Sequence, residues 1–184
     1  MTDKTKQKIL NAALKIFARE GYKSATTKSI AEESGFTETT LFRKFDTKEN
    51  LFDAAMIQNY EIFMKDYVSF VQNLEQKNGS PNEFLETYVK KLEKYFNDNI
   101  EFLSLMVNEE EYKKIEFDMG ELNILIGKYL EKNIKNSKID CTALGFYINS
   151  FLYVIILEKY LGRKTLKNED PIKKFISNLN QCFN

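Results

Sequence analysis

Only seven glycines and two prolines interrupt the 184 residues of this chain, and that scarcity limits what it can fold into. A protein of many strands needs a turn between successive strands, and turns depend on glycine, proline, asparagine and aspartate. The long segments between these breaks are rich in residues that favour helices. A hydrophobic content of 43% supplies enough side chains for a buried core. We therefore expect an all-α protein of one or two domains with about nine helices.

The first predicted helix spans residues 4–20 and has a clear apolar face. Its apolar side chains recur at the spacing of one helical stripe and are Ile9, Ala12, Ala13, Ile16 and Phe17. Gly21 follows, and glycine readily adopts the left-handed conformation at which helices end. The pattern therefore predicts a helix that packs one face on a core and ends at Gly21.

Two short helices are predicted next, over 27–34 and 38–45. Thr26 and Thr37 precede them, and a threonine hydroxyl at this position accepts a hydrogen bond from a free N–H of the first turn. Gly35 provides the tight turn between the two helices. Three side chains of the second helix are expected to point inward or partly inward: Leu41, Phe42 and Phe45. Such a pair is typical of the helix-turn-helix unit, which places its second helix in the major groove of DNA.

The rest of the chain also consists of predicted helices. Four of them span 48–76, 82–97, 100–107 and 110–135, and Gly120 is a candidate break within the last of these four. Two more follow, one from Asp140 to Gly162 and one that begins at Asp170-Pro171. The most apolar stretch, 146–157, is shorter than the roughly 20 residues that a membrane span needs. We expect a buried helix there and no contact with a membrane.

The charges and cysteines narrow the classes of function. The chain has 27 basic and 27 acidic residues, but residues 1–50 carry ten basic residues against seven acidic ones. An excess of basic residues in the first 50 positions and of acidic residues in the rest suits a protein whose amino-terminal part binds the phosphates of a nucleic acid. Histidine is absent, and Cys141 and Cys182 form no ligand cluster, so we expect no metal, no cofactor and no enzyme activity. The cysteine usage, with no signal segment, predicts reduced thiols in a cytoplasmic protein.

The first part of the chain resembles a known family. The residues that carry the resemblance are Ile9-Leu10-x-Ala12-Ala13-x-x-x-Phe17, Gly21-Tyr22, Thr26, Ile30-Ala31, Gly35-Phe36, Thr40-Leu41-Phe42-x-x-Phe45 and Lys48-Glu49-x-Leu51. Over about residues 4–55 this pattern resembles the DNA-binding domain of TetR (tetracycline-repressor-like) regulators. It is specific because apolar, glycine and threonine positions agree at fixed spacing across four elements. The resemblance implies a DNA-binding domain over 1–47 and a helical effector-binding and dimerisation domain over 48–184, connected by the helix over 48–76.

The resemblance also implies which side chains contact DNA. The candidates are Thr26, Thr27, Lys28, Thr37, Glu38, Thr39, Thr40, Phe42, Arg43, Lys44 and Lys48. Lys48 matches a family position that touches a phosphate, and Arg43 is suited to guanine or to phosphate. Three positions depart from the family: Thr39 replaces a frequent glycine, Phe42 replaces a usual tyrosine, and Glu38 is acidic where a polyanion is expected. Helix capping and plain solvation remain open as alternatives for the threonines and lysines.

A homodimer is expected because one helix-turn-helix covers too few base pairs to select one site in a genome. Two related by a two-fold axis bind a palindromic operator of double-stranded DNA. The helix over 140–162 is apolar on nearly every face, which suggests burial against its own core and against a partner. The candidate interface residues are Leu144, Tyr147, Phe151, Ile155, Ile172, Phe175, Ile176 and Leu179.

The resemblance further implies a small hydrophobic or aromatic effector bound among the helices over 48–162. The candidate pocket residues are Tyr60, Phe63, Tyr67, Tyr88, Phe96, Phe102, Met106, Phe117, Phe146, Asn149 and Tyr153, for which plain core packing is the alternative. The implied function is a sequence-specific transcription regulator, most often a repressor that a ligand releases from its operator. An enzyme, disfavoured by the lack of histidine, and a helical adaptor that binds another protein are the competing classes.

Overall fold

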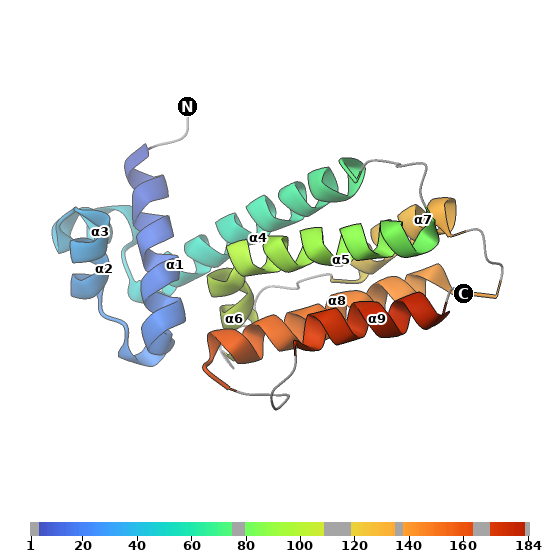
Figure 1. Ribbon diagram of the computed structural model, residues 1–184. Helices are drawn as coiled ribbons and strands as arrows, with labels where there is room; N and C mark the ends of the chain where they lie inside the picture. The colour runs from blue at the N-terminus through green and yellow to red at the C-terminus, as the bar shows by residue number, and fades with distance from the viewer. Residues whose placement is uncertain (1–3, 75–79, 109–118, 135–137, 164–169, 183–184) are drawn as a thin grey trace. The chain divides into compact units, whose positions relative to one another are not determined.

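The computed structural model describes residues 4–74, 80–108, 119–134, 138–163 and 170–182 of the 184. Every regular element among these residues is a helix, in the order α1 to α9 (Figure 1). The all-α class predicted from the sequence is confirmed. The chain divides into two compact units. The first comprises Met1–Phe63 and Glu101–Phe117, and the second comprises Met64–Ile100 and Asp118–Asn184.

The helices lie close to where the sequence predicts them. Their bounds are α1 Lys4–Ser24, α2 Thr27–Ser34, α3 Glu38–Phe45, α4 Lys48–Gln72, α5 Pro81–Asp98, α6 Ile100–Asn108, α7 Met119–Asn133, α8 Cys141–Tyr160 and α9 Pro171–Cys182. Gly21 has φ 76° and ψ 157°, so the helical dihedrals break there as predicted, although α1 resumes beyond it. The predicted end of α4 at residue 76 was wrong, because the chain tightens at Leu74, whose N–H donates to the Val71 carbonyl at 3.2 Å. The expected helical start over 110–118 lies outside the described residues.

The first unit is built around α1. Its buried residues are Ile9, Leu10, Ala12, Ala13, Leu14, Ile16 and Phe17, which confirms the predicted apolar stripe. Phe17 meets Phe52 of α4 edge to face with ring centroids 4.8 Å apart, and Tyr22 lies against both rings. Burial of each such side chain contributes about 1.5–3 kcal/mol. This aromatic contact fixes the start of α4 against the end of α1.

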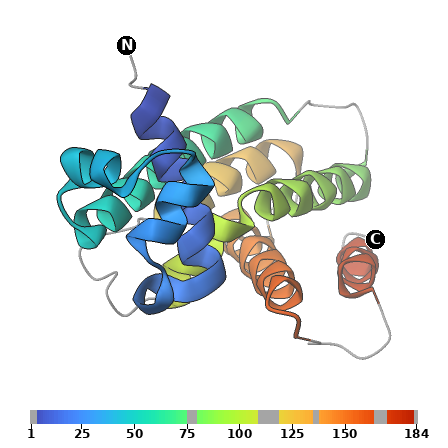
Figure 2. The same ribbon diagram turned by 90° about the vertical axis from the view of Figure 1, so that its left-hand side faces the viewer.

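In the second unit α7 and α8 cross at two glycines. A Cβ built on Gly127 of α7 would lie 2.8 Å from the Cα of Thr142, and one on Gly145 of α8 would lie 2.6 Å from Ile126 Cγ2. Only residues without a Cβ allow helix backbones to approach this closely. The close approach at Gly145 is therefore between α8 and α7 of the same chain. Helix α8 also packs with α5 and α9, and Figure 2 shows α8 and α9 close to end-on.

A group of uncharged polar side chains, the Asn149 network, lies inside the second unit. The Tyr88 hydroxyl of α5 donates to Asn149 Oδ1 of α8 at 2.7 Å. Asn149 Nδ2 donates to the Tyr67 hydroxyl of α4 at 3.2 Å and to Asn123 Oδ1 of α7 at 3.0 Å. Tyr67 and Tyr88 are both fully buried, and this burial raises the pKa of each hydroxyl. Four helices therefore meet at one asparagine.

Helix α8 is longer than its most apolar stretch suggested. By length and composition alone it could cross a membrane, a test that the core helix of a globular domain also passes. Its buried residues are Cys141, Gly145, Ile148, Leu152, Ile156 and Leu157. They recur three, four or one residue apart, so they form a stripe on one side of the helix. This stripe is the pattern of a helix that packs on its own domain.

Candidate nucleic-acid interface

Helices α2 and α3 are joined by a short turn at Gly35. Gly35 has φ 75° and ψ 22°, a left-handed conformation that glycine adopts without strain. Its N–H donates to the Glu32 carbonyl at 3.2 Å, and the Phe36 N–H donates to the Ala31 carbonyl at 3.0 Å. These bonds satisfy carbonyls at the end of α2 and reverse the chain into α3. The predicted helix-turn-helix is confirmed, with both helix bounds where the sequence placed them.

Threonine hydroxyls begin both helices. Thr26 Oγ1 accepts from the Ser29 N–H at 3.0 Å while Ser29 Oγ accepts from the Thr26 N–H at 3.2 Å, a reciprocal capping box. Thr37 Oγ1 accepts from the Thr40 N–H at 3.3 Å. Both predicted caps are confirmed, and each contributes about 1 kcal/mol to helix stability. The caps fix where α2 and α3 start, and so which residues lie along their exposed sides.

The predicted DNA contacts differ in exposure. Six are exposed: Thr26, Lys28, Thr37, Thr39, Phe42 and Arg43. Five are half-buried: Thr27, Glu38, Thr40, Lys44 and Lys48. The expectation that Phe42 points inward or partly inward was wrong, because Leu41 and Phe45 fill the core positions and leave 46% of Phe42 exposed. An aromatic ring at this place offers apolar contact area to a partner such as a thymine methyl group.

Glu38 has a partner inside the helix-turn-helix. Its Oε1 accepts a hydrogen bond from the Thr27 hydroxyl at 2.6 Å, in a part-buried position. The bond joins the first residue of α2 to the first residue of α3. A carboxylate in the first turn of a helix also interacts favourably with the helix dipole. The acidic residue that departs from the family pattern thus ties the two helices together.

Lys48 also bonds within the protein. Its Nζ donates to the carbonyls of Tyr22 at 2.7 Å, Ala25 at 2.9 Å and Lys23 at 3.4 Å. It also lies 4.5 Å from the centroid of the Tyr22 ring, within cation–π range. The contact of Lys48 with a phosphate, implied by the resemblance, stays a prediction.

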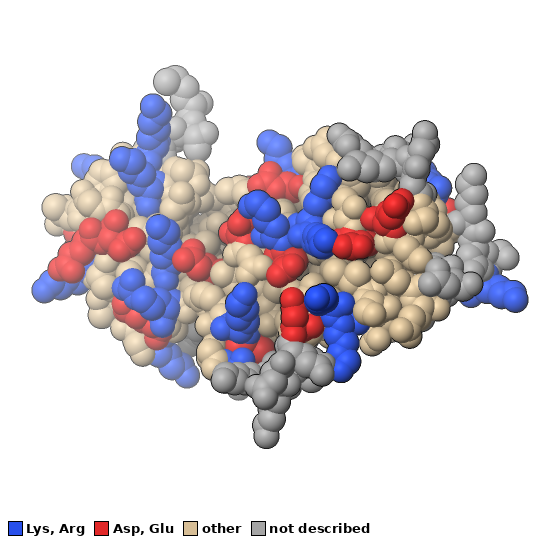
Figure 3. Space-filling view, viewed as in Figure 1, with Lys and Arg blue, Asp and Glu red and all other residues tan. Residues whose placement is uncertain are grey.

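Basic and acidic side chains are interspersed on the face that Figure 3 shows. Arg19 pairs with Glu20 at 2.7 Å and Lys15 with Glu33 at 3.9 Å. Lys28 and Arg43 form no ion pair with any other described residue. These two exposed cations of α2 and α3 are therefore available to an anionic partner.

Comparison with known proteins finds relatives of the amino-terminal part of the chain. Residues 9–55 match the family model of bacterial regulatory proteins, tetR family. This segment, which runs from α1 into the start of α4, is thus similar to the DNA-binding domain of that family. YvkB, an uncharacterized HTH-type transcriptional regulator of Bacillus subtilis, is 40% identical over 55 residues, which are 30% of this chain and 29% of YvkB. The chain thus matches less than a third of the length of this relative.

Solved structures extend the likeness in fold to the whole chain. The fatty acid degradation regulator FadR of Bacillus halodurans has a TM-score of 0.66 at 15% identity, over 100% of this chain and 96% of that one. A TetR-like transcriptional regulator of Rhodococcus sp. RHA1 has a TM-score of 0.64 at 13% identity, over 96% and 93% of the two chains. At such identities the likeness establishes the TetR-type fold alone.

Five of the predicted pocket residues lie in the second unit and contact one another in two groups. Tyr67, Tyr88 and Asn149 share the Asn149 network. Phe96 meets Tyr153 edge to face with ring centroids 6.4 Å apart. Burial raises the pKa of Tyr153 to about 12. These residues supply aromatic surface and neutral hydrogen-bonding groups.

The other predicted pocket residues differ in their burial and in the unit to which they belong. Phe63 and Phe102 meet in the first unit, with ring centroids 5.5 Å apart. Tyr60 and Met106 are half-buried. Phe146 is 50% exposed, and Phe117 lies outside the described residues. A single pocket shared by all these side chains stays a prediction.

The predicted dimer residues are mostly half-buried. Tyr147 is 63% exposed. The half-buried ones are Leu144, Phe151, Ile155, Ile172, Phe175, Ile176 and Leu179. Phe151 and Phe175 stack with ring centroids 4.1 Å apart, so this pair packs α8 on α9 within one chain. Their role in a dimer stays a prediction.

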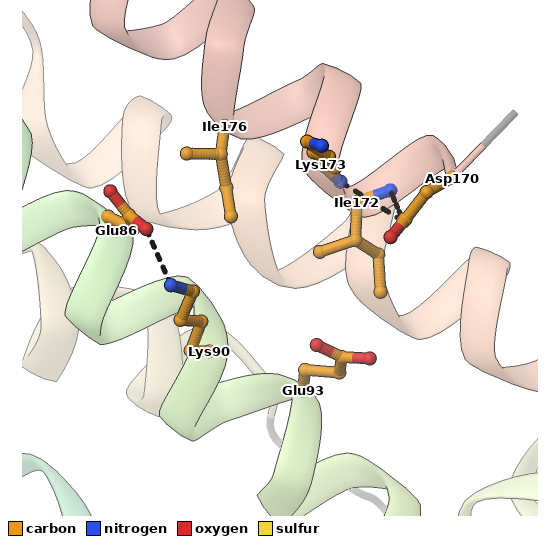
Figure 4. A pocket seen from close by; sticks show the side chains of 7 residues that line it. All are labelled: Glu86, Lys90, Glu93, Asp170, Ile172, Lys173 and Ile176. Atoms are coloured by element: carbon orange, nitrogen blue, oxygen red, sulfur yellow. Dashed lines mark hydrogen bonds and ion pairs between the residues drawn. The ribbon is translucent and has the colours of Figure 1, made fainter.

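A groove of about 300 Å³ lies between α5 and α9 (Figure 4). Its lining residues are Glu86, Lys90, Glu93, Asp170, Ile172, Lys173 and Ile176. Lys90 pairs with Glu86 at 2.5 Å, and Asp170 Oδ1 accepts from the N–H groups of Ile172 and Lys173 at 3.1 Å. The groove therefore contains two predicted dimer residues but none of the predicted pocket residues, and most of its charged groups already have partners.

Two contacts, one in the Asn149 network and one at the interface, could not be predicted from the sequence. Asn123 meets Asn149 across 26 positions, and Tyr22 meets Lys48 across 26 positions. Contacts between such distant residues leave no periodic pattern. The capping box of Ser80 and Glu83 at the start of α5 differs, because Ser-x-x-Glu is a recognisable spacing.

Proposed function

We propose that this protein is a DNA-binding transcription regulator of the TetR type, with residues 1–47 binding DNA and residues 48–184 binding an effector and forming a dimer. The observation that carries the proposal is the α2–Gly35–α3 unit with Thr37, Thr39 and Arg43 exposed on it. Such a second helix enters the major groove with its amino-terminal residues against the base edges. Exposed cations outside the groove bind phosphate. A cytoplasmic location is part of the proposal.

The first test replaces Arg43 with alanine. We expect operator affinity to fall by about 1–3 kcal/mol and base preference to relax at one position, because a guanidinium can bond guanine O6 and N7 together. The operator comes from selection of bound sequences from random duplexes, and affinity is measured by fluorescence anisotropy. The matched variant Lys28→Ala should weaken binding to all duplexes alike and lower the salt slope by about 0.9. Wild-type protein without preference for any duplex over bulk DNA would favour the adaptor class.

A homodimer on a palindromic operator is the second part of the proposal. Phe146, Tyr147 and Val154 of α8 are 50%, 63% and 48% exposed, on a helix whose other side is buried. Exposed apolar side chains gathered on one helix support a surface that a second copy covers. Light scattering at micromolar concentration should give a dimer for the wild type and a monomer for Tyr147→Glu. Lys128→Glu on the exposed surface of α7 should stay dimeric, and a monomeric wild type would reject this part.

A repressor released by a small effector is the third part. The Asn149 network sits among aromatic rings, with Tyr67 and Tyr95 5.7 Å apart and Phe70 and Tyr95 stacked at 5.5 Å. Apolar walls with a few neutral polar groups suit a hydrophobic or aromatic molecule without charge. A panel of such compounds should contain one that lowers operator affinity by about 1–3 kcal/mol. A panel that shifts neither operator affinity nor the melting temperature would count against effector control.

A further inference from the structure

We propose that Lys48 is a positioning residue that holds the helix-turn-helix closed at its base, and that it does so instead of contacting phosphate. The proposal rests on the DNA-binding function proposed above. Lys48 is the first residue of α4. A cation at the amino end of a helix meets the positive end of the helix dipole, so it is unfavourable unless other groups compensate. The groups that compensate here belong to the protein itself.

The compensating groups are backbone carbonyls at the end of α1 and just beyond it. Lys48 Nζ lies 2.7 Å from the Tyr22 oxygen, 2.9 Å from the Ala25 oxygen and 3.4 Å from the Lys23 oxygen. An ammonium group has three donors, and these carbonyls accept all three. Carbonyls at the end of a helix lack intrahelical partners and carry the negative end of its dipole. We call Lys48 with these three carbonyls the Lys48 clamp.

The Lys48 clamp joins the two ends of the helix-turn-helix. Ala25 comes directly before Thr26, the cap of α2, and Lys48 follows Thr47 directly. The residues between them, 26–47, comprise α2, the turn at Gly35 and α3. The hydrogen bonds of Lys48 therefore hold the two ends of this segment next to each other.

Aromatic packing supports the clamp from one side. The Lys48 ammonium lies over the Tyr22 ring, whose centroid is 4.8 Å from that of Phe52. Lys48 and Phe52 are four residues apart, so they lie on the same side of α4. One helical turn of α4 thus holds the end of α1 by a cationic contact and an apolar contact together. Loss of the ammonium leaves only the apolar contact, and the start of α2 is then free to shift relative to α4.

The test compares Lys48→Met with the wild type on the selected operator and on a random duplex, each over a range of salt. We expect operator affinity to fall about tenfold or more, as when hydrogen bonds to a charged group are lost. Affinity for the random duplex and the salt slope should stay as in the wild type, because no phosphate contact is removed. Equal losses on both duplexes with a slope lower by about 0.9 would show a phosphate contact and overturn the proposal. Operator affinity equal to that of the wild type would overturn it as well.

A second measurement uses the protein without DNA. Amide hydrogen exchange over residues 26–34 should be faster in Lys48→Met than in Lys28→Met, which removes an equal charge from an exposed side chain. Unchanged exchange in Lys48→Met would reject the clamp whatever the DNA results are. If the wild type shows no operator preference while exchange responds to Lys48→Met, the proposed function fails and the clamp stands. Circular dichroism at the assay temperature ensures that only folded variants are compared.

Discussion

Replacing Gly127 with alanine is expected to lower the free energy of unfolding by about 3 kcal/mol, at the upper end of the cost of overpacking a core. The new Cβ would lie 2.8 Å from the Thr142 Cα and 2.5 Å from Thr142 Oγ1. The hydroxyl can rotate away, but a backbone atom can move only if α7 and α8 separate. Urea unfolding followed by circular dichroism measures the loss.

The stability loss of Gly127→Ala is compared with the losses of two other variants. Gly145→Ala should cost less, because its Cβ would meet the Ile126 Cγ2, the end of a side chain, at 2.6 Å. Lys128→Ala, at the exposed position next to Gly127, should change stability by less than about 0.5 kcal/mol. Wild-type stability in Gly127→Ala would mean that the two backbones do not approach as described.

Asn149→Ala is expected to lower the free energy of unfolding by about 2–4 kcal/mol, since each buried polar group left without a partner costs about 1–3 kcal/mol. The substitution removes the acceptor of the Tyr88 hydroxyl, which is fully buried, and two donated bonds to Tyr67 and Asn123. Thermal and urea unfolding measure the change. Ser150→Ala, next along α8, serves as the control and should be nearly neutral.

A double-mutant cycle shows whether the Tyr88 bond is the cause. Tyr88→Phe removes the donor, so in the Asn149→Ala background no donor remains unsatisfied at that point. The double variant should therefore lose less stability than the sum of the two single variants, by about 1 kcal/mol. Additive losses would mean that the two side chains do not interact.

Local sequence signals predicted the interface well. Thr26, Gly35 and Thr37 act on their own neighbours, so the bounds of α2 and α3 follow from a few residues. The apolar stripe of α1 is likewise a local pattern. The inward position expected for Phe42 failed because an eight-residue helix buries only a narrow face, which Leu41 and Phe45 fill. The network and the Lys48 clamp could not be predicted, because each depends on packing between helices far apart in the sequence.

The Asn149 network consists of two tyrosines and two asparagines, which are uncharged around neutral pH. The raised pKa values of Tyr67 and Tyr88 keep both protons in place in the folded protein, so these groups reduce stability only as the pH rises above their ordinary value near 10. The 184 residues also contain no histidine, the side chain that ordinarily titrates near neutrality. A change of pH around neutrality therefore leaves the hydrogen bonds of this network in place, because none of its four side chains gains or loses a proton there.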